Sequence, residues 1–304
     1  MTNGAIRKES APPRAPSLGE RLQGFAVAVA FGFFGLLRLD TASALGGFIA
    51  RSIGPWLPIS RLALANIRRA MPELADDEVK RILHGMWDNI GRIAAEYPHL
   101  HEFRCYEGGR IEVVGAENID LMREDGMGGI FFSGHLGNWE IGALSATQRG
   151  VPLAQAYRAP NNPIVDRLIR AIRDRAIAGE RHPKGREGGR RLARSLLEGG
   201  HLAMLIDQKQ NEGIPVPFFG HEAKTMTALA TFALKNRFPV VPARVERMGG
   251  ARFRITLLAP MALPDTGDKE ADVFETMRRV NALLESWIRE RPEQWLWLHR
   301  RWPD

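Results

Sequence analysis

The chain has 304 residues, and its 44% hydrophobic and 25% charged residues are typical of a folded protein and exclude a largely disordered chain. The single cysteine, Cys105, excludes an internal disulfide and a zinc site built from several thiolates. A formal net charge of +7 favours an anionic partner, and nucleic acid, acidic lipid, a phosphorylated substrate and an acidic carrier protein all qualify.

The N-terminal part divides into a polar tail and an apolar segment. Residues 1–19 carry three prolines among small and charged residues, which predicts a flexible tail. Residues 24–37 contain no charged residue, and a weaker apolar stretch follows them. We therefore predict an N-terminal membrane-anchoring helix within a membrane-associated segment, residues 20–57.

The apolar run is short for a transmembrane helix. Fourteen helical residues span about 21 Å, whereas the hydrocarbon core is about 30 Å thick, so a tilted span and a helix lying at the interface both fit. Two alternatives to an anchor remain open. One is a buried core helix, and the other is a secretory signal peptide with a cleavage site at the small residues 42–44.

From residue 58 onward the pattern is that of one domain, residues 58–304. Apolar positions recur at helical spacing in residues 76–97. Beyond residue 111, short β-rich runs alternate with helical ones, which predicts an α/β sheet flanked by helices. The predicted strands are residues 111–115, 129–134, 152–158, 202–207, 239–246 and 252–258, and the helices among them are near residues 139–149, 161–178, 187–198, 225–237 and 271–290.

The strongest signal for chemistry is His135, which follows the apolar strand 129–134, with Glu140 five residues later. Open α/β sheets bind ligands at the carboxyl ends of strands. Five residues correspond to about 500° of helical rotation, so only a turn brings these two side chains together, and Gly134 and Gly137 supply its backbone freedom. A carboxylate bonded to one imidazole nitrogen raises the basicity of the other, so the pair predicts a general base.

Other roles for His135 have less support. The remaining histidines are scattered and no HExxH motif occurs, which argues against a metal site. Ser133 is near, but the G-x-S-x-G motif of α/β hydrolases is absent from the sequence. A hydrogen-bonded core histidine at a strand end remains as an alternative. The sequence has no Walker or GxGxxG motif, so no nucleotide cofactor is expected.

Three further features bear on binding. Residues 161–200 contain ten Lys or Arg against five Asp or Glu, which suits a phosphorylated acceptor or an anionic carrier, or else a solvated helix face. No nucleic-acid-binding module accompanies them, so nucleic acid is not expected as a partner. Asp207 follows an apolar strand and either shares a site with His135 or caps the next loop. Four tryptophans among the last eighteen residues suit either a membrane interface or the core.

Several separated motifs follow one another along the chain. They are GHLGNWE at 134–140, YRAPNNPIVD at 157–166, LAMLIDQ at 202–208, VPFFG at 216–220 with Thr225 beyond it, and QWLWLHRRW at 294–302. In this order they resemble the late acyltransferases of lipid A biosynthesis, the lauroyl and myristoyl transferases of Gram-negative bacteria, and the resemblance covers nearly the whole chain. The broader glycerolipid acyltransferase superfamily is similar at H-x4-D, whereas Glu140 gives the H-x4-E form of the lipid A branch.

The resemblance implies a glycerolipid-acyltransferase-like mixed sheet flanked by helices, and it assigns roles to residues. His135 is the implied catalytic base and Glu140 its orienting partner. Arg173 and Asp207 match the family's other polar site positions and are the implied substrate-binding residues. Arg158 is a further candidate, because the register among the nearby arginines is not fixed. Backbone N–H groups around Gly137 are expected to hold the oxyanion.

The implied reaction is transfer of a fatty acyl group from acyl carrier protein or acyl-CoA to a hydroxyl of a phosphorylated glycolipid acceptor, a lipid A precursor. It requires no metal, no redox cofactor and no acyl-enzyme. The implied location is the inner membrane, with the catalytic domain on the cytoplasmic side. The alternatives are an acyltransferase for a lysophospholipid, an amino-acid lipid or a glycosylated phosphoinositide, and a non-catalytic membrane lipid-binding protein.

Overall fold

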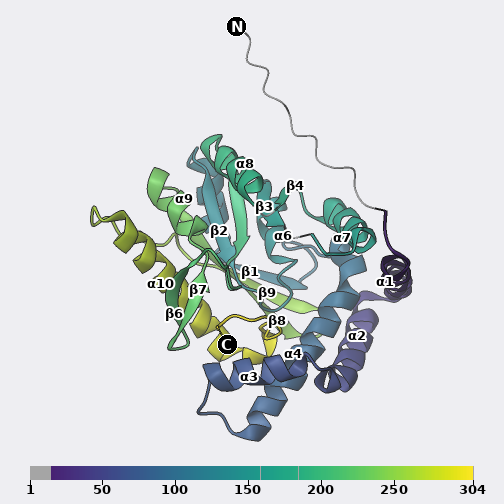
Figure 1. Ribbon diagram of the computed structural model, residues 1–304. Coiled ribbons are helices and arrows are strands. Elements are labelled where there is room, and N and C mark those ends of the chain that lie inside the picture. Colours follow the sequence, from purple (N-terminus) through teal and green to yellow (C-terminus); the bar gives the residue numbers. More distant parts are fainter. Residues whose placement is uncertain (1–14, 158, 184, 304) are drawn as a thin grey trace.

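The computed structural model describes residues 15–157, 159–183 and 185–303 (Figure 1). The helices are α1 Leu18–Leu36, α2 Leu39–Ile53, η1 Gly54–Trp56, α3 Ser60–Ala70, α4 Asp76–Glu96, η2 Tyr97–Glu102, α5 Glu117–Glu124, α6 Gly142–Thr147, α7 Pro163–Ala176, α8 Arg186–Leu197, α9 Ala228–Asn236, α10 Lys269–Glu290 and η3 Pro292–Gln294. The strands are β1 Ile111–Val114, β2 Gly129–Ser133, β3 Leu153–Tyr157, β4 Gly179–Pro183, β5 His201–Leu205, β6 Ile214–Phe218, β7 His221–Thr225, β8 Val240–Gly249 and β9 Arg252–Leu257.

A seven-stranded mixed sheet forms the centre of the molecule, in the order β1-β9-β8-β2-β5-β3-β4. The five strands from β8 to β4 are parallel to one another, while β9 pairs antiparallel with β8 and parallel with β1. Because β2 and β5 lie side by side near the middle of the sheet, their carboxyl ends meet at one edge, next to the segments that carry His135 and Asp207.

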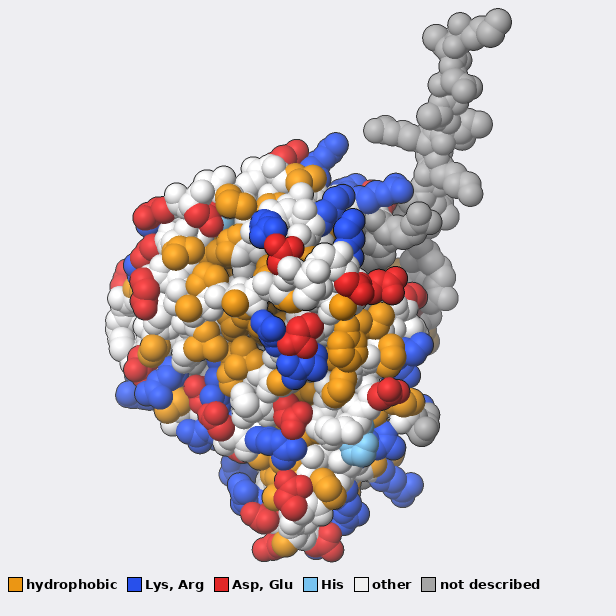
Figure 2. Space-filling view, turned by 90° about the vertical axis from the view of Figure 1, so that its left-hand side faces the viewer, with side chains coloured by type: hydrophobic (Ala, Val, Ile, Leu, Met, Phe, Trp, Pro, Cys, Tyr) orange, Lys and Arg blue, Asp and Glu red, His pale blue; other side chains and the backbone are white. Residues whose placement is uncertain are grey.

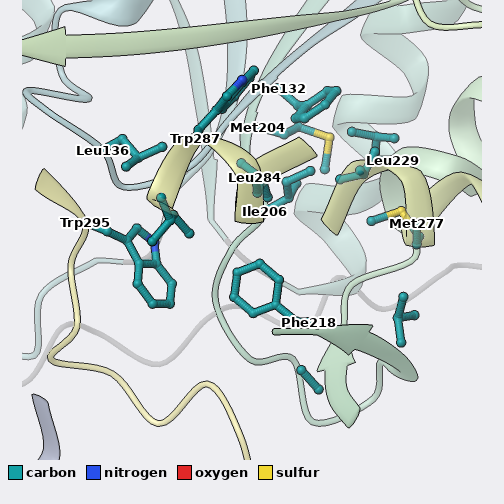
Figure 3. Packing of buried hydrophobic residues seen from close by; sticks show 14 of the residues in the cluster. Phe132, Leu136, Met204, Ile206, Phe218, Leu229, Met277, Leu284, Trp287 and Trp295 are labelled. Atoms are coloured by element: carbon teal, nitrogen blue, oxygen red, sulfur yellow. The ribbon is translucent and has the colours of Figure 1, made fainter. Parts of the chain in front are cut away.

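Each face of the sheet is covered by its own hydrophobic cluster. One cluster joins buried residues of β2 and β5 to α8, α9 and α10, and Figure 3 shows Leu284 and Trp287 of α10 beside Phe132 and Met204. The rings of Phe132 and Trp287 stack with their centroids 6.4 Å apart. The second cluster joins the other face to α5, α6 and η2. Burial of both faces explains why the central strands are nearly continuous apolar runs.

The two N-terminal helices pack on the body of the molecule, at the right-hand edge of Figure 1. A capping box between Ser17 and Glu20 starts α1. Helix α2 crosses α4 at two glycines. A Cβ atom added to Gly46 would lie 2.4 Å from the Gly91 carbonyl oxygen, so only glycine permits this close approach.

The α/β class, the mixed sheet and the flanking helices are confirmed. Three strands were not predicted. The sequence of β4 lacks an apolar alternation because it lies at the sheet edge, and β6 and β7 form a separate antiparallel hairpin whose first strand contains Pro215 and Pro217. Proline cannot donate to a ladder, so strands of this kind escape a search for apolar runs.

The structure does not support the expected membrane-anchoring helix as a transmembrane helix. Among the helices of the described ranges, none combines the length and the hydropathy that crossing a bilayer requires. Helix α1 falls short because the polar residues Glu20, Arg21 and Gln23 lie in its first two turns. The predicted flexible tail falls mainly on residues 1–14, which lie outside the described ranges, and α1 already begins at Leu18.

The C-terminal tryptophans belong to the core rather than to a membrane interface. Trp287, Trp295, Trp297 and Trp302 are all buried. Trp295 packs with Trp297, Trp302 and Phe218, whereas Trp287 stacks on Phe132. On the face of the molecule shown in Figure 2, basic and acidic side chains are interspersed around patches of apolar ones.

Candidate active site

His135 and Asp207 form the centre of the site. His135 follows β2 and Asp207 lies two residues beyond the end of β5, and the parallel pairing of these strands brings the two residues together. The Nδ1 atom of His135 lies 2.7 Å from Oδ1 of Asp207. The backbone N–H of His135 donates to Oδ2 of the same carboxylate, also at 2.7 Å. Ring and main chain of His135 are therefore both held by one side chain.

Asp207 is fully buried and acts as an acceptor for three donors, the third being the indole N–H of Trp295 at 2.7 Å. Burial alone would raise the pKa of Asp207, but its charge interaction and hydrogen bonds with His135 outweigh burial and hold that pKa well below its usual range. An ionised carboxylate only accepts hydrogen bonds, so Nδ1 of His135 carries a proton. In the neutral ring, Nε2 is then unprotonated and keeps the lone pair that a general base requires.

The predicted pairing of His135 with Glu140 is wrong. The carboxylate of Glu140 is instead paired with Arg173, whose Nε donates to Oε2 at 2.8 Å and whose Nη2 donates to Oε1. Helix α7 carries Arg173 over the loop that holds Glu140, and such a bidentate pair satisfies both carboxylate oxygens. The orienting partner of His135 is therefore Asp207, which the sequence analysis placed among the substrate-binding residues. Because Asp207 is buried behind His135, it contacts the imidazole rather than a ligand.

The Glu140–Arg173 pair is enclosed by aromatic rings. The guanidinium of Arg173 lies 5.2 Å from the ring centre of Tyr157 and 5.9 Å from that of Tyr97. Burial disfavours the Arg173 cation, but the charge interaction and hydrogen bond with Glu140 outweigh this effect and raise its pKa. Burial also raises the pKa of Tyr97, with a smaller contribution from Glu140, so this phenol stays neutral.

Trp139 connects the two halves of the site. Its ring meets the His135 ring edge to face, with centroids 5.2 Å apart, and its indole N–H donates to Oε1 of Glu140 at 3.2 Å. His135 and Glu140 thus both line one pocket, although they are not hydrogen-bonded to each other.

A pocket of about 400 Å³ opens at these residues and extends over the sheet face below α6. Polar side chains lie at one end, among them His135, Glu140, Arg173 and Gln208. The remaining lining is mostly apolar, with small residues on α6 and on β5. Strand register shows its depth. Leu153 is level with Gly129, four residues before Ser133, so the lining reaches about 13 Å along the strands.

The loop between His135 and Glu140 has the glycine turn that the sequence predicts. Gly137 has φ = 56°, and a Cβ atom there would lie 2.6 Å from the Val245 carbonyl oxygen. Of the backbone N–H groups around Gly137 that were expected to hold the oxyanion, that of Gly137 is already engaged, because it donates to the carbonyl oxygen of Gln294 at 3.1 Å. Gln208, for which the sequence predicted no role, lies beside His135. The amide Nε2 of Gln208 is 3.4 Å from Nε2 of His135.

The other predicted residues are placed as follows. Arg158 lies outside the described residues. The basic residues of 161–200 are partly neutralised, since Arg170, Arg181 and Arg191 each pair with a carboxylate. Within the part of the chain that the structure describes, no group of three or more His, Cys, Asp or Glu side chains could hold a metal ion.

The geometry thus combines a carboxylate-oriented imidazole with a pocket that also has an extended apolar part. The model of the bacterial lipid A biosynthesis acyltransferase family matches residues 17–304. The chain belongs to this family of O-acyltransferases. Family membership confirms the resemblance seen in the sequence and supports acyl transfer in lipid A biosynthesis.

Three curated relatives are identical to this chain at about a quarter of the aligned positions. A lipid A biosynthesis myristoyltransferase of Escherichia coli is 26% identical over 242 residues, which cover 78% of this chain and 73% of the relative. A lipid A biosynthesis lauroyltransferase of the same organism is 24% identical over 254 residues, covering 80% and 78%. A lipid A biosynthesis acyltransferase of Haemophilus influenzae is 25% identical over 252 residues, covering 78% and 73%.

Proposed function

We propose that this acyltransferase moves a fatty acyl group from a thioester donor, acyl carrier protein or acyl-CoA, to a hydroxyl of a lipid A precursor, with His135 as the general base. The observation that carries this proposal is the hydrogen bond between His135 Nδ1 and the buried Asp207, at the polar end of a pocket whose other walls are mostly apolar side chains. Family membership supplies the acceptor class.

In the proposed reaction, the acceptor hydroxyl attacks the thioester carbonyl carbon while His135 Nε2 takes its proton. Asp207 holds the ring in the required tautomer and stabilises the imidazolium. The tetrahedral intermediate then loses the thiolate, which takes the proton back from His135. The products are an ester and a free thiol. The acceptor oxygen is the nucleophile, so no acyl-enzyme forms.

Two side chains support the charge that develops. The amide of Gln208 lies beside His135 Nε2 and is suited to donate to the carbonyl oxygen as it becomes an oxyanion. The guanidinium of Arg173 places a positive charge at the same end of the pocket, and its hydrogen bonds with Glu140 fix the orientation of that group. These are our assignments for Gln208, Glu140 and Arg173.

The donor and the membrane are part of the same proposal. Exposed arginines on α7 and α8, such as Arg167 and Arg190, favour an anionic donor or the phosphates of the acceptor. We propose a location at the inner membrane, with the catalytic domain on the cytoplasmic side, and helix α1 suits contact with a membrane interface. Its exposed apolar side chains recur along one helix face, at Leu18, Leu22, Phe25, Val29, Phe33 and Leu36.

A direct assay tests the proposed function. Purified protein in lipid vesicles or detergent is incubated with a lipid A precursor and a panel of acyl-CoA and acyl carrier protein thioesters, and the lipid products are weighed by mass spectrometry. The expected product is the precursor plus one acyl group. Acylation of a lysophospholipid under the same conditions, with the lipid A precursor unchanged, would contradict the proposal.

A further inference from the structure

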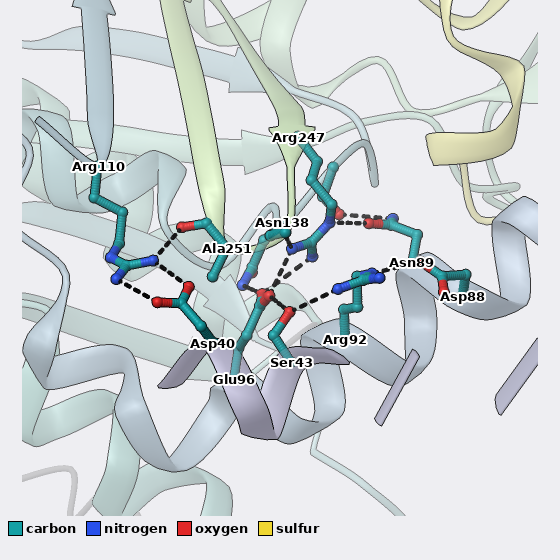
Figure 4. A network of polar contacts seen from close by, with 12 residues as sticks. Asp40, Ser43, Asp88, Asn89, Arg92, Glu96, Arg110, Asn138, Arg247 and Ala251 are labelled. Carbon is teal, nitrogen blue, oxygen red and sulfur yellow. Dashed lines mark hydrogen bonds and ion pairs between the residues drawn. The ribbon is translucent and has the colours of Figure 1, made fainter. Parts of the chain in front are cut away.

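A buried ion pair, whose two residues do not line the active-site pocket, lies behind the loop of residues 135–140, here called the catalytic loop. Glu96, near the end of α4, is fully buried, and Arg247 of β8 is 8% exposed. Arg247 Nη1 donates to Glu96 Oε1 at 2.5 Å and Nη2 donates to Oε2 at 3.0 Å (Figure 4). Such a pair offsets its desolvation cost only when the remaining polar atoms also find partners.

Those partners come from several elements. Ser43 of α2 donates to Glu96 at 2.6 Å, and Arg247 donates through Nε to Asn89 of α4 at 2.9 Å and through Nη1 to the carbonyl oxygen of Gly250 at 2.7 Å. The pair is therefore fixed from α2, α4 and β8 together, and Figure 4 shows these side chains converging on Glu96. It forms a rigid support, because moving any one group leaves a buried charge without its partner.

The catalytic loop is attached to this support through Asn138, which lies between His135 and Glu140 and is fully buried. Asn138 Nδ2 donates to Glu96 Oε2 at 2.8 Å, and its Oδ1 accepts from the backbone N–H of Glu140 at 3.2 Å. One amide therefore spans from the ion pair to the residue that pairs with Arg173. Asn89 adds a second attachment, donating to the carbonyl oxygen of Gly137 at 2.9 Å.

We propose that Asn138 is a positioning residue. It uses the Glu96–Arg247 pair as its support to fix the main chain of Glu140, and through Glu140 it fixes the guanidinium of Arg173 at the polar end of the pocket. This inference rests on the proposed function, in which that end holds the reacting groups. A displacement of about 1 Å in such a group lowers a rate on the order of 10²-fold.

The first test replaces Asn138 by alanine. We expect kcat to fall on the order of 10- to 100-fold, while KM for the acyl donor stays within about twofold because the apolar part of the lining, which would bind the acyl chain, is unchanged. The matched control is Asn281→Ala, which removes another fully buried amide with two hydrogen bonds, on α10. Equal losses of kcat in the two variants, or a rise in KM at unchanged kcat, would overturn the proposal.

The second test uses Asn138→Asp, which keeps the acceptor for Glu140 but loses the donor to Glu96. The charges facing the new carboxyl are Glu96, Arg247 and Glu140, and when ionised it repels Glu96. Protonation restores a donor. The activity of this variant relative to the wild type should therefore rise as pH falls. A ratio that does not change with pH would show that the amide merely fills space.

Crystal structures separate this inference from the proposed function. If the wild type transfers no acyl group to the lipid A precursor, the proposed function fails, and the positioning role is then decided by geometry alone. In Asn138→Ala, the bidentate contact between Glu140 and Arg173 should be lost. An unchanged contact would refute the positioning role. Should the alanine variant fail to fold, the structure of Asn138→Asp at high pH decides the same question.

Discussion

At the scale of single residues, the site depends on the contact between His135 and Asp207. Asp207 accepts from the ring, from the main chain of His135 and from Trp295, all at 2.7 Å. Glu140 is nearer to His135 in sequence, yet it belongs to a different pair. The residue that sets the tautomer of the base is therefore 72 positions away along the chain.

Replacement of Asp207 by asparagine tests this assignment. An amide can donate to Nδ1 of His135 and favour the wrong tautomer, so we expect kcat to fall on the order of 10²- to 10⁴-fold, with little change in KM for the donor. Steady-state kinetics with the lipid A precursor measure this. The comparison is Glu140→Gln, in which the new side chain has nearly the same shape as the old one at the polar end of the pocket. A smaller loss in Asp207→Asn than in Glu140→Gln would contradict the role of Asp207.

The depressed pKa of Asp207 also predicts how stability depends on pH. A carboxyl whose pKa is lower in the folded state contributes stability that is present above its unfolded pKa and is lost as pH falls through the folded value. Below about pH 4, the free energy of unfolding of the wild type should fall more steeply than that of Asp207→Asn. Urea denaturation at a series of pH values checks this, and parallel curves would count against it.

At the scale of elements, the strands that build the site were predicted because each is a short apolar run before a polar residue. The pairing of Glu140 with Arg173 was not predicted. Glu140 follows a loop with a left-handed glycine at Gly137, and a loop has no regular periodicity from which the direction of a side chain can be predicted. Which residue meets which is set by the sheet order and by α7, and neither has a local signal. Edge strand β4 and the proline-containing hairpin were missed because neither contains the apolar run by which the other strands were recognised.

Helix α1 carries a prediction of its own. Phe25 is 69% exposed on its apolar face. Burial of such a side chain in a bilayer interface stabilises binding by about 1.5–3 kcal/mol. Phe25→Ser should therefore weaken binding to anionic phospholipid vesicles by about 10-fold or more, measured by co-sedimentation. Phe274→Ser, on α10 at the opposite edge of Figure 1, is the matched control and should bind as the wild type does. Equal binding by both variants would contradict an interfacial α1.

At the scale of the whole molecule, the pocket lies between the sheet and the helices that cover it, so its depth is set by packing across the entire fold. Polar residues at one end and small or apolar residues along the remainder match a thioester with a fatty tail. Composition and periodicity predicted the sheet, but they contain no information on the depth of a space between layers.

Ala203 offers a way to shorten the pocket. It lies on β5, level with Phe131 and two residues below Ser133, and it lines the cavity. Ala203→Leu should reduce rates with long acyl donors at least about 10-fold relative to short ones, because each lost methylene contact costs about 0.8 kcal/mol. Rates over a series of donor lengths measure this. Ala154→Leu, buried on the opposite face, is the control and should lower stability without changing the chain-length profile.

The most direct measurement is the initial rate of acyl transfer by purified His135→Ala, with the lipid A precursor and the best thioester donor. His221→Ala, in the hairpin strand β7, is the matched control. The account predicts a loss on the order of 10²- to 10⁴-fold for His135→Ala and a normal rate for His221→Ala. A His135→Ala rate within a few-fold of the wild type would contradict general-base catalysis at this site.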